Sequence, residues 1–284
     1  MLCVQLGVVL RRRVPARALA DASGRVQGRR RGQARTRDCA VLSIRSVALC
    51  YERGTGTTKD AREAFGWYRR AAEAGDVMSQ ARLAHCFANG TGVAADKRTA
   101  VIWYRRAAEA GHVVAQYNLG VHYDNGTGVA ADKCAAVTWY RRAADQGHAA
   151  AQQNLGICYE TGHGVAVDLS AAFELYRRAA EAGHVGAQYN LGRCYRLGTG
   201  VTADARLAVE WYRRAAEAGL ASAQLVLGVS YTNGTGVAAD ARAAAEWVER
   251  AAASSDATIA EGARGARHSA RAVIRRASSW TRPL

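Results

Sequence analysis

Apolar residues follow a helical spacing over most of this sequence. Ala115, Leu119 and Tyr123 lie at positions i, i+4 and i+8, so a helix through them would carry one apolar stripe. Ala100 and Tyr104 belong to a second stripe of the same kind on the preceding segment. The chain has only two prolines, both outside these segments, so nothing interrupts the helical runs. The pattern predicts pairs of short amphipathic helices that pack closely on one another.

The helix pairs recur along the chain every 36 residues. The YRRAA block starts at Tyr68, Tyr104, Tyr140, Tyr176 and Tyr212, with a degenerate copy from Val248. First helices are predicted at about 43–53, 79–89, 115–125, 151–161, 187–197 and 223–233. Second helices are predicted at about 60–74, 96–110, 132–146, 168–182, 204–218 and 240–254. A period of this length indicates a stacked-repeat array, because a single pair cannot bury both of its stripes.

Polar and glycine residues recur at the expected helix boundaries. An aspartate precedes every second helix, where its carboxylate can accept hydrogen bonds from the first backbone N–H groups; the set is Asp60, Asp96, Asp132, Asp168, Asp204 and Asp240. A pair of glycines follows every first helix, as in Gly198 and Gly200, where the chain needs a residue that tolerates positive φ. The boundaries therefore have a chemical cause in each copy.

The repeating pattern A-Q-Y-N-L-G-x-x-Y-x-x-G-x-G-V-x-x-D-x-x-x-A-x-x-W-Y-x-x-A-A-x-x-G resembles the Sel-1-like repeat, a relative of the tetratricopeptide repeat. The resemblance covers about residues 40–254. It implies an all-α fold, a right-handed α/α superhelical solenoid, that serves as an adaptor for protein complexes. The first copy, over 45–67, and the last second helix, where Val248 replaces tyrosine, depart from the pattern.

The net charge of +15 is concentrated outside the repeats. Residues 1–39 hold ten arginines against Asp21 and Asp38, a balance of +8, and are expected to form a disordered basic leader. Residues 255–284 carry +4 and are expected to form a basic capping helix and tail. The repeats between them are nearly balanced at +3. The alternative to a scaffold function is therefore binding of nucleic acid or another anionic surface through the arginine-rich tails.

No pattern in the repeats indicates catalysis, a cofactor or a metal site. The GTGVAAD connectors lack the Lys-Ser/Thr ending of a phosphate-binding loop. His112, His148 and His184 recur once per repeat, too far apart to share one zinc ion, and are read as loop residues. A β-lactam-directed hydrolase, known among cysteine-rich relatives, is the less favoured reading because their cysteine pairs are absent. We therefore expect a non-enzymatic protein without a cofactor.

The compartment is not encoded clearly. No run approaches the roughly 20 apolar residues that a membrane span needs. The cytoplasm is the default expectation, and organelle targeting by the arginine-rich leader is the alternative. The N-G-T sequons at Asn89, Asn125 and Asn233 are read as turn residues rather than glycosylation sites.

A protein partner is expected on the face of the first helices that points away from the packed stripe. This face varies from copy to copy while the framework stays fixed, as a binding wall should. The predicted binding residues are Tyr117, Val121, Asp124, Gln153, Ile157, Glu160, Tyr189, Arg193 and Arg196. Ala81, His85 and Ala88 occupy the same positions one copy earlier. Tyr117 and Tyr189 would anchor an extended peptide or a helix, with acidic residues in the middle and basic residues at one end.

Overall fold

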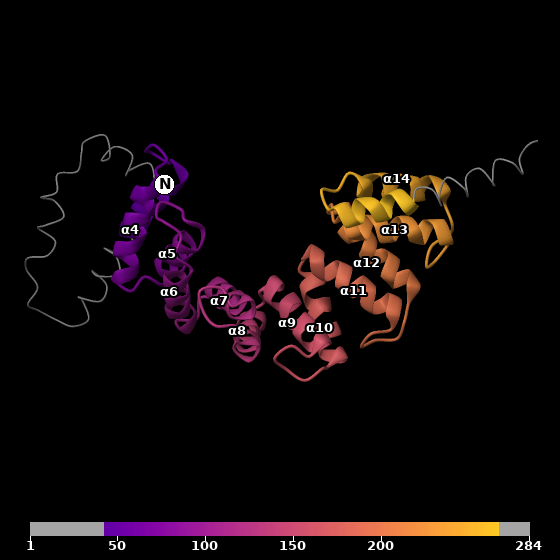
Figure 1. The fold of residues 1–284 in the computed structure, drawn as a ribbon, viewed down its shortest axis with the longest axis horizontal. Helices are drawn as coiled ribbons and strands as arrows, with labels where there is room; N and C mark the ends of the chain where they lie inside the picture. The colour runs from indigo at the N-terminus through magenta and orange to yellow at the C-terminus, as the bar shows by residue number, and fades with distance from the viewer. Residues whose placement is uncertain (1–42, 267–284) are drawn as a thin grey trace, which may run out of the picture. The chain divides into compact units, whose positions relative to one another are not determined.

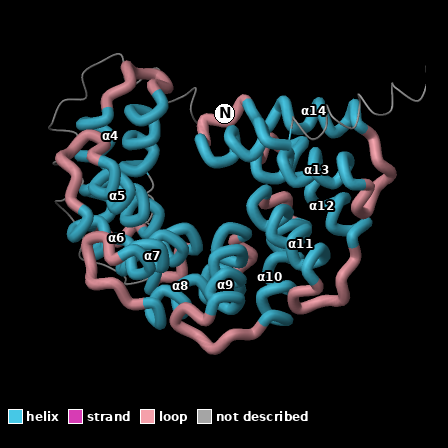
Figure 2. Tube along the Cα trace, turned by 45° about the vertical axis from the view of Figure 1, so that its right-hand side comes forward, coloured by secondary structure: helices cyan, strands magenta, loops and turns pink. Residues whose placement is uncertain are grey.

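The computed structural model describes residues 43–266, and within this range the chain is helical, with loops but no strand (Figure 2). The chain divides into two units, at Asp132 and Lys133. In the first unit, a helix over 43–53 precedes the four helices α4 (Ala61–Glu73), α5 (Val77–Asn89), α6 (Lys97–Glu109) and α7 (Val113–Asn125) (Figure 1). The predicted leader, 1–39, lies outside the described residues.

The second unit continues the same alternation of first and second helices. Its helices are α8 (Lys133–Asp145), α9 (Ala149–Thr161), α10 (Leu169–Glu181), α11 (Val185–Leu197), α12 (Ala205–Glu217), α13 (Ala221–Asn233) and α14 (Ala241–Ala252), followed by a helix over 257–266. Within each unit, each helix packs on the next one along the chain, as α9, α10 and α11 do (Figure 1). The predicted all-α solenoid of helix pairs is confirmed.

Aspartates and glycines set the helix ends as predicted. Asp204 caps α12, because its carboxylate accepts hydrogen bonds from the backbone N–H groups of Arg206 and Leu207 at 2.8 and 3.1 Å. Gly198 ends α11 in the left-handed conformation with φ +72°. Helices α5, α7, α9, α11 and α13, however, begin two residues earlier than expected. In α5, α7, α9 and α11, the residue before the helix caps it with its side chain, as described below.

The core consists of recurring tyrosine, leucine and alanine side chains. In the second unit, Tyr176 and Leu191 are fully buried together with Ala179 and Ala187. The same layer recurs around Leu227, where Val209 and Ala215 are buried. Alanine keeps the helices close, so that the larger side chains interlock between neighbouring helices. The apolar stripes predicted from spacing are thus the packed faces.

The last repeat is covered by the helix over 257–266. Ala263 of this helix is buried against Val248 and Ala251 of α14, and Ile259 packs on the same cluster. An end repeat of a solenoid exposes an apolar face, which such a helix removes from water. The remainder of the predicted basic tail, 267–284, lies outside the described residues.

Candidate functional site

The predicted binding residues lie on three first helices. In the first unit, Tyr117, Val121 and Asp124 are half-buried on α7. In the second unit, α9 carries Gln153, Ile157 and Glu160, and α11, which contacts α9, carries Tyr189, Arg193 and Arg196. The structure therefore brings together the six predicted residues of the second unit.

The charged members of this set bind one another and the core tyrosines. The Tyr176 hydroxyl donates a hydrogen bond to the Glu160 carboxylate at 2.7 Å, and Arg193 forms an ion pair with the same carboxylate. Arg196 donates from Nε to the Tyr212 hydroxyl at 3.2 Å. Burial first, and then the hydrogen bond to Glu160, raises the pKa of Tyr176, so this phenol stays a donor. The charges of the predicted acidic middle and basic end are therefore partly neutralised by contacts within the protein.

A rule emerges from these contacts. In three repeats the residue 16 positions before the recurring tyrosine contacts its hydroxyl: Arg196 does so for Tyr212, Glu160 for Tyr176, and Glu52 for Tyr68, where the hydrogen bond is 2.6 Å long. The residues at this position are Glu52, Ala88, Asp124, Glu160, Arg196 and Thr232. The first five precede a tyrosine, and Ala88 is the one of these that carries no polar group.

The Tyr104 side chain, which pairs with Ala88 by this rule, borders two pockets in the first unit. One has a volume of about 330 Å³, and its lining includes Ala88, Tyr104 and Asn118. The other has a volume of about 260 Å³ and shares Tyr104 and Asn118 with the first. Ala81 and Ala88 are only 8% and 7% exposed, because a methyl group does not reach past its longer neighbours.

Sequence reasoning did not predict the pockets. The available signal was Ala88, which stands where two other repeats carry glutamate and one carries aspartate. That signal could be interpreted only once the contact between the tyrosine hydroxyl and the residue 16 positions earlier was known.

The paired arginines of the second helices contact aromatic side chains in more repeats than they contact carboxylates. The second arginine of a pair stacks on the tryptophan three residues earlier, as Arg106 does on Trp103 with 4.6 Å between Cζ and the ring centroid. The first arginine donates to a tyrosine hydroxyl in three repeats, as Arg105 does to Tyr123 at 2.6 Å. Ion pairs on this face are found at Arg69 with Glu73 and at Arg177, described next.

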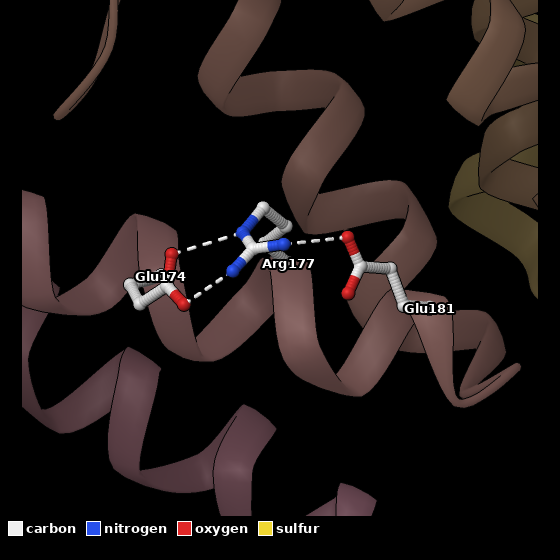
Figure 3. A network of polar contacts seen from close by, with 3 residues as sticks. All are labelled: Glu174, Arg177 and Glu181. Atoms are coloured by element: carbon white, nitrogen blue, oxygen red, sulfur yellow. Dashed lines mark hydrogen bonds and ion pairs between the residues drawn. The ribbon is translucent and has the colours of Figure 1, made fainter.

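Arg177 lies between two glutamates on the surface of α10 (Figure 3). It contacts Glu174 with two nitrogens, at 2.6 and 2.9 Å, and Glu181 with a third, at 2.7 Å. The hydrogen bond from Arg177 lowers the pKa of Glu174. In this repeat Leu175 replaces the tryptophan, so Arg178 lacks the indole ring on which the second arginine stacks in other repeats. The exposed network is a solvated face rather than a binding site.

The recurring histidines that precede first helices are helix caps. Nδ1 of His112, His148 and His184 accepts a hydrogen bond from the backbone N–H three residues later, at 3.1, 3.2 and 3.4 Å. Asp76 has this role for α5, whereas Leu220 leaves α13 without a side-chain cap. Only a neutral imidazole has a free acceptor nitrogen, so each cap depends on deprotonated histidine. These caps lie at the early starts of α7, α9 and α11 noted above, whereas α13 starts equally early without one.

We expect acid to weaken these caps. Burial lowers the pKa of His148 below its ordinary value, and the nearby His184 lowers it further. As the pH falls, His148 is therefore protonated in the unfolded chain before it is protonated in the folded one. The stability that the cap contributes is complete above about pH 6.5 and is lost as the pH falls below that value. His148→Asn, which keeps an acceptor but does not titrate in this range, should reduce the loss between pH 7.5 and pH 5 by about 1 kcal/mol.

Urea unfolding at the two pH values measures this difference. His163→Asn is the matched control, because His163 lies in an exposed loop of the same unit and caps no helix. An unchanged pH dependence in His148→Asn would show that the cap does not titrate as inferred.

Two further observations bear on the chemistry available to residues 43–266. No three histidine, cysteine, aspartate or glutamate side chains in this range are close enough to hold a metal ion. Burial raises the pKa of the thiols of Cys86 and Cys194 to about 11, so both are poor nucleophiles at neutral pH. No helix in the same range is both long and apolar enough to cross a membrane.

Comparison with known families now adds to this geometry. The profile of the Sel1 repeat matches six consecutive segments, 42–76, 77–112, 113–148, 149–184, 185–220 and 221–256. The chain belongs to the Sel1 repeat family. The six Sel1 segments coincide with the helix pairs of the structure, and each begins at or within two residues of the start of a first helix.

Solved structures of other Sel1 repeat proteins are similar to this one. One is c5321, a protective antigen of uropathogenic Escherichia coli strains with an SLR fold; it is 37% identical with a TM-score of 0.72. The match covers 79% of this chain but only 49% of the antigen, so the chain spans about half the antigen's length. A Sel1 repeat protein from Oxalobacter formigenes is 33% identical with a TM-score of 0.69, over 74% of this chain and 84% of that one. A search of curated proteins finds no match.

Proposed function

We propose that this Sel1 repeat protein is a non-enzymatic scaffold that binds an extended peptide or a helix of a protein partner. Sel1 repeat proteins are generally protein-interaction scaffolds, and their solenoid fold is typically non-catalytic. The finer proposal is that the partner binds the varying face of the first helices, on Tyr117, Val121 and Asp124 in the first unit. In the second unit, the proposed binding residues are Gln153, Ile157, Glu160, Tyr189, Arg193 and Arg196.

The observation that carries this proposal is the contrast between fixed and varying positions in structurally equivalent helices. Four of the five buried positions of α7, α9 and α11 hold the same residues in all three helices, namely alanine, glutamine, leucine and glycine. The face with Tyr117 in α7 holds Gln153 in α9 and Tyr189 in α11. Ile157 on this face is 37% exposed, which leaves an aliphatic side chain open to a partner. Aromatic and aliphatic side chains within reach of solvent are the usual anchors of peptide recognition.

Replacing both Tyr117 and Tyr189 with alanine tests the proposal. The measurement is affinity capture followed by quantitative mass spectrometry. We expect the double variant to capture at least tenfold less of the partner protein than the wild type does. The reason is the loss of two large anchors, each typically worth more than about 1 kcal/mol in an interface. Circular dichroism melts establish that the variant is folded.

The matched control is Tyr123→Ala with Tyr195→Ala. It makes the same chemical change on the same two helices, at tyrosines outside the proposed face: Tyr123 contacts Arg105, and Tyr195 stacks on Phe173. This control should keep the partner. Equal capture of the partner by the Tyr117/Tyr189 variant and the wild type would rule out the proposed binding face. Binding through the arginine-rich tails, the alternative function, stays a prediction because most of the tail residues lie outside the described range.

A further inference from the structure

We propose that the pocket between Ala88 and Tyr104 binds a carboxylate from an acidic side chain of the partner. In this position the ligand would take the place that Glu52 and Glu160 occupy in two other repeats. The inference rests on the proposed function, in that the carboxylate belongs to a bound peptide, and it adds the chemistry that the peptide must carry.

The chain itself contains the template for this site. In the first repeat, the Tyr68 hydroxyl donates to Glu52 at 2.6 Å, and Arg82 of the next first helix pairs with the same carboxylate at 3.4 Å. In the fourth repeat, Tyr176 and Arg193 hold Glu160 in the same way. In these two repeats the space beside the tyrosine hydroxyl thus holds a carboxylate that also pairs with a cation.

The second repeat has this space but not the carboxylate. Ala88 stands at the glutamate position, and a pocket of about 330 Å³ lies beside it. Tyr104 is only 3% exposed, yet its hydroxyl has no hydrogen-bond partner among residues 43–266. Burial raises the pKa of Tyr104 to about 12, so the hydroxyl keeps its proton and remains a donor. Tyr104 lines the pocket, so a ligand bound there can accept a hydrogen bond from this hydroxyl.

The other polar groups of the pocket also favour an anion. Lys97 donates to the backbone carbonyl of Ala88, and its ammonium group has two further hydrogens to offer. Asn118 brings an amide and His85 an imidazole to the wall. None of the lining residues carries a carboxylate, so a negative charge would meet no repulsion from the wall. The set therefore selects an acceptor with negative charge over a neutral one.

The second pocket indicates what lies next to the acidic residue. It has a volume of about 260 Å³ and shares His85, Tyr104 and Asn118 with the first. Met78 and Val114 on its wall are 47% and 48% exposed, which is high for apolar side chains. Both volumes are close to the lower limit of about 300 Å³ for small-molecule sites, so each space suits a single side chain. The geometry therefore favours a peptide with an aliphatic residue near an acidic one.

A titration followed by nuclear magnetic resonance tests the carboxylate. The probe is N-acetylglutamate N-methylamide, and its neutral counterpart is the glutamine compound, which has the same shape. We expect saturable shifts of the Asn118 side-chain amide and the His85 ring with the glutamate probe, and at least tenfold weaker binding of the glutamine compound. Equal binding of the two compounds would overturn the proposal. Tighter binding of inorganic phosphate than of the glutamate probe would also overturn it.

Two variants locate the binding. Ala88→Glu restores the carboxylate that the first and fourth repeats carry, so it should fill the pocket from within and abolish the shifts. Tyr104→Phe removes a hydroxyl that binds nothing in the protein, so it should fold as the wild type and weaken binding at least fivefold. Tyr68→Phe, the same change where the carboxylate is internal, should leave binding unchanged. Wild-type binding by both Ala88→Glu and Tyr104→Phe would exclude this pocket.

The outcome separates this inference from the proposed function. If the glutamate probe fails while partner capture still depends on Tyr117 and Tyr189, the carboxylate site is wrong and the scaffold stands. If the probe binds in the pocket but capture is indifferent to Tyr117 and Tyr189, the pocket stands and the proposed face is wrong.

Discussion

Gly200→Ala is expected to destabilise the second unit by about 3–4 kcal/mol, among the largest effects of a single added methyl group. Gly200 has φ +71°, where an alanine costs about 1–2 kcal/mol in strain. A Cβ atom at this position would also lie 2.1 Å from the backbone oxygen of Leu169 and 3.1 Å from Cβ of Phe173. Since a backbone carbonyl at the start of α10 cannot swing aside, the loop has to move away from that helix, and the packing between two repeats is lost.

Gly219→Ala is the matched control for this prediction. Gly219 lies in the same unit at φ +92°, but a Cβ atom there meets nothing within 4 Å. Its cost should be limited to the strain of the backbone, about 1–2 kcal/mol. Urea unfolding followed by circular dichroism measures both. Equal costs in the two variants would mean that the approach of Gly200 to α10 contributes nothing.

The repeat period and the boundary chemistry made the fold predictable. A side chain at the same place in every copy, such as Tyr176 or Asp204, has to satisfy the same neighbours each time, so its role can be inferred from recurrence alone. Asp204 indeed caps α12, and Tyr176 is indeed buried. The start of a helix was harder to predict where a residue type that is uncommon at the N-cap position caps the helix. His148 caps α9 through a ring nitrogen, a role more often held by serine or aspartate.

The candidate site was less predictable, because it depends on contacts between helices. The helical spacing placed Glu160 and Arg193 on one face, but not in contact with each other or with Tyr176. Those contacts follow from how far α9, α10 and α11 approach one another, which is a tertiary property. The pocket at Ala88 needed the same knowledge, since a missing glutamate is meaningful only once its usual partner is known. The second arginine of a pair, such as Arg106, likewise stacks on tryptophan because of side-chain rotamers that sequence spacing does not fix.

Tyr176→Ala should cost about 3–5 kcal/mol in the free energy of unfolding of the second unit, the usual loss for removing a fully buried aromatic ring. The ring is 0% exposed and packs among Ala180, Leu191 and Cys194. Tyr176→Phe separates the hydroxyl from the ring. It should cost only about 1–2 kcal/mol, because Glu160 loses one donor but keeps Arg193. Urea unfolding gives both values, and a Phe variant as unstable as the Ala variant would place the main contribution in the hydrogen bond.

A double-mutant cycle with Gly156 shows whether the tyrosine ring is the reason for glycine inside α9. A Cβ atom on Gly156 would lie 2.7 Å from Cε1 of Tyr176, so Gly156→Ala should destabilise the wild type by about 1–3 kcal/mol through overpacking. In the Tyr176→Ala background the ring is gone, and alanine should instead stabilise the helix by up to about 1 kcal/mol, because its helix propensity exceeds that of glycine. The two substitutions should therefore couple by about 2–3 kcal/mol. Additive effects would mean that the small residue in α9 serves some purpose other than the close approach of the Tyr176 ring.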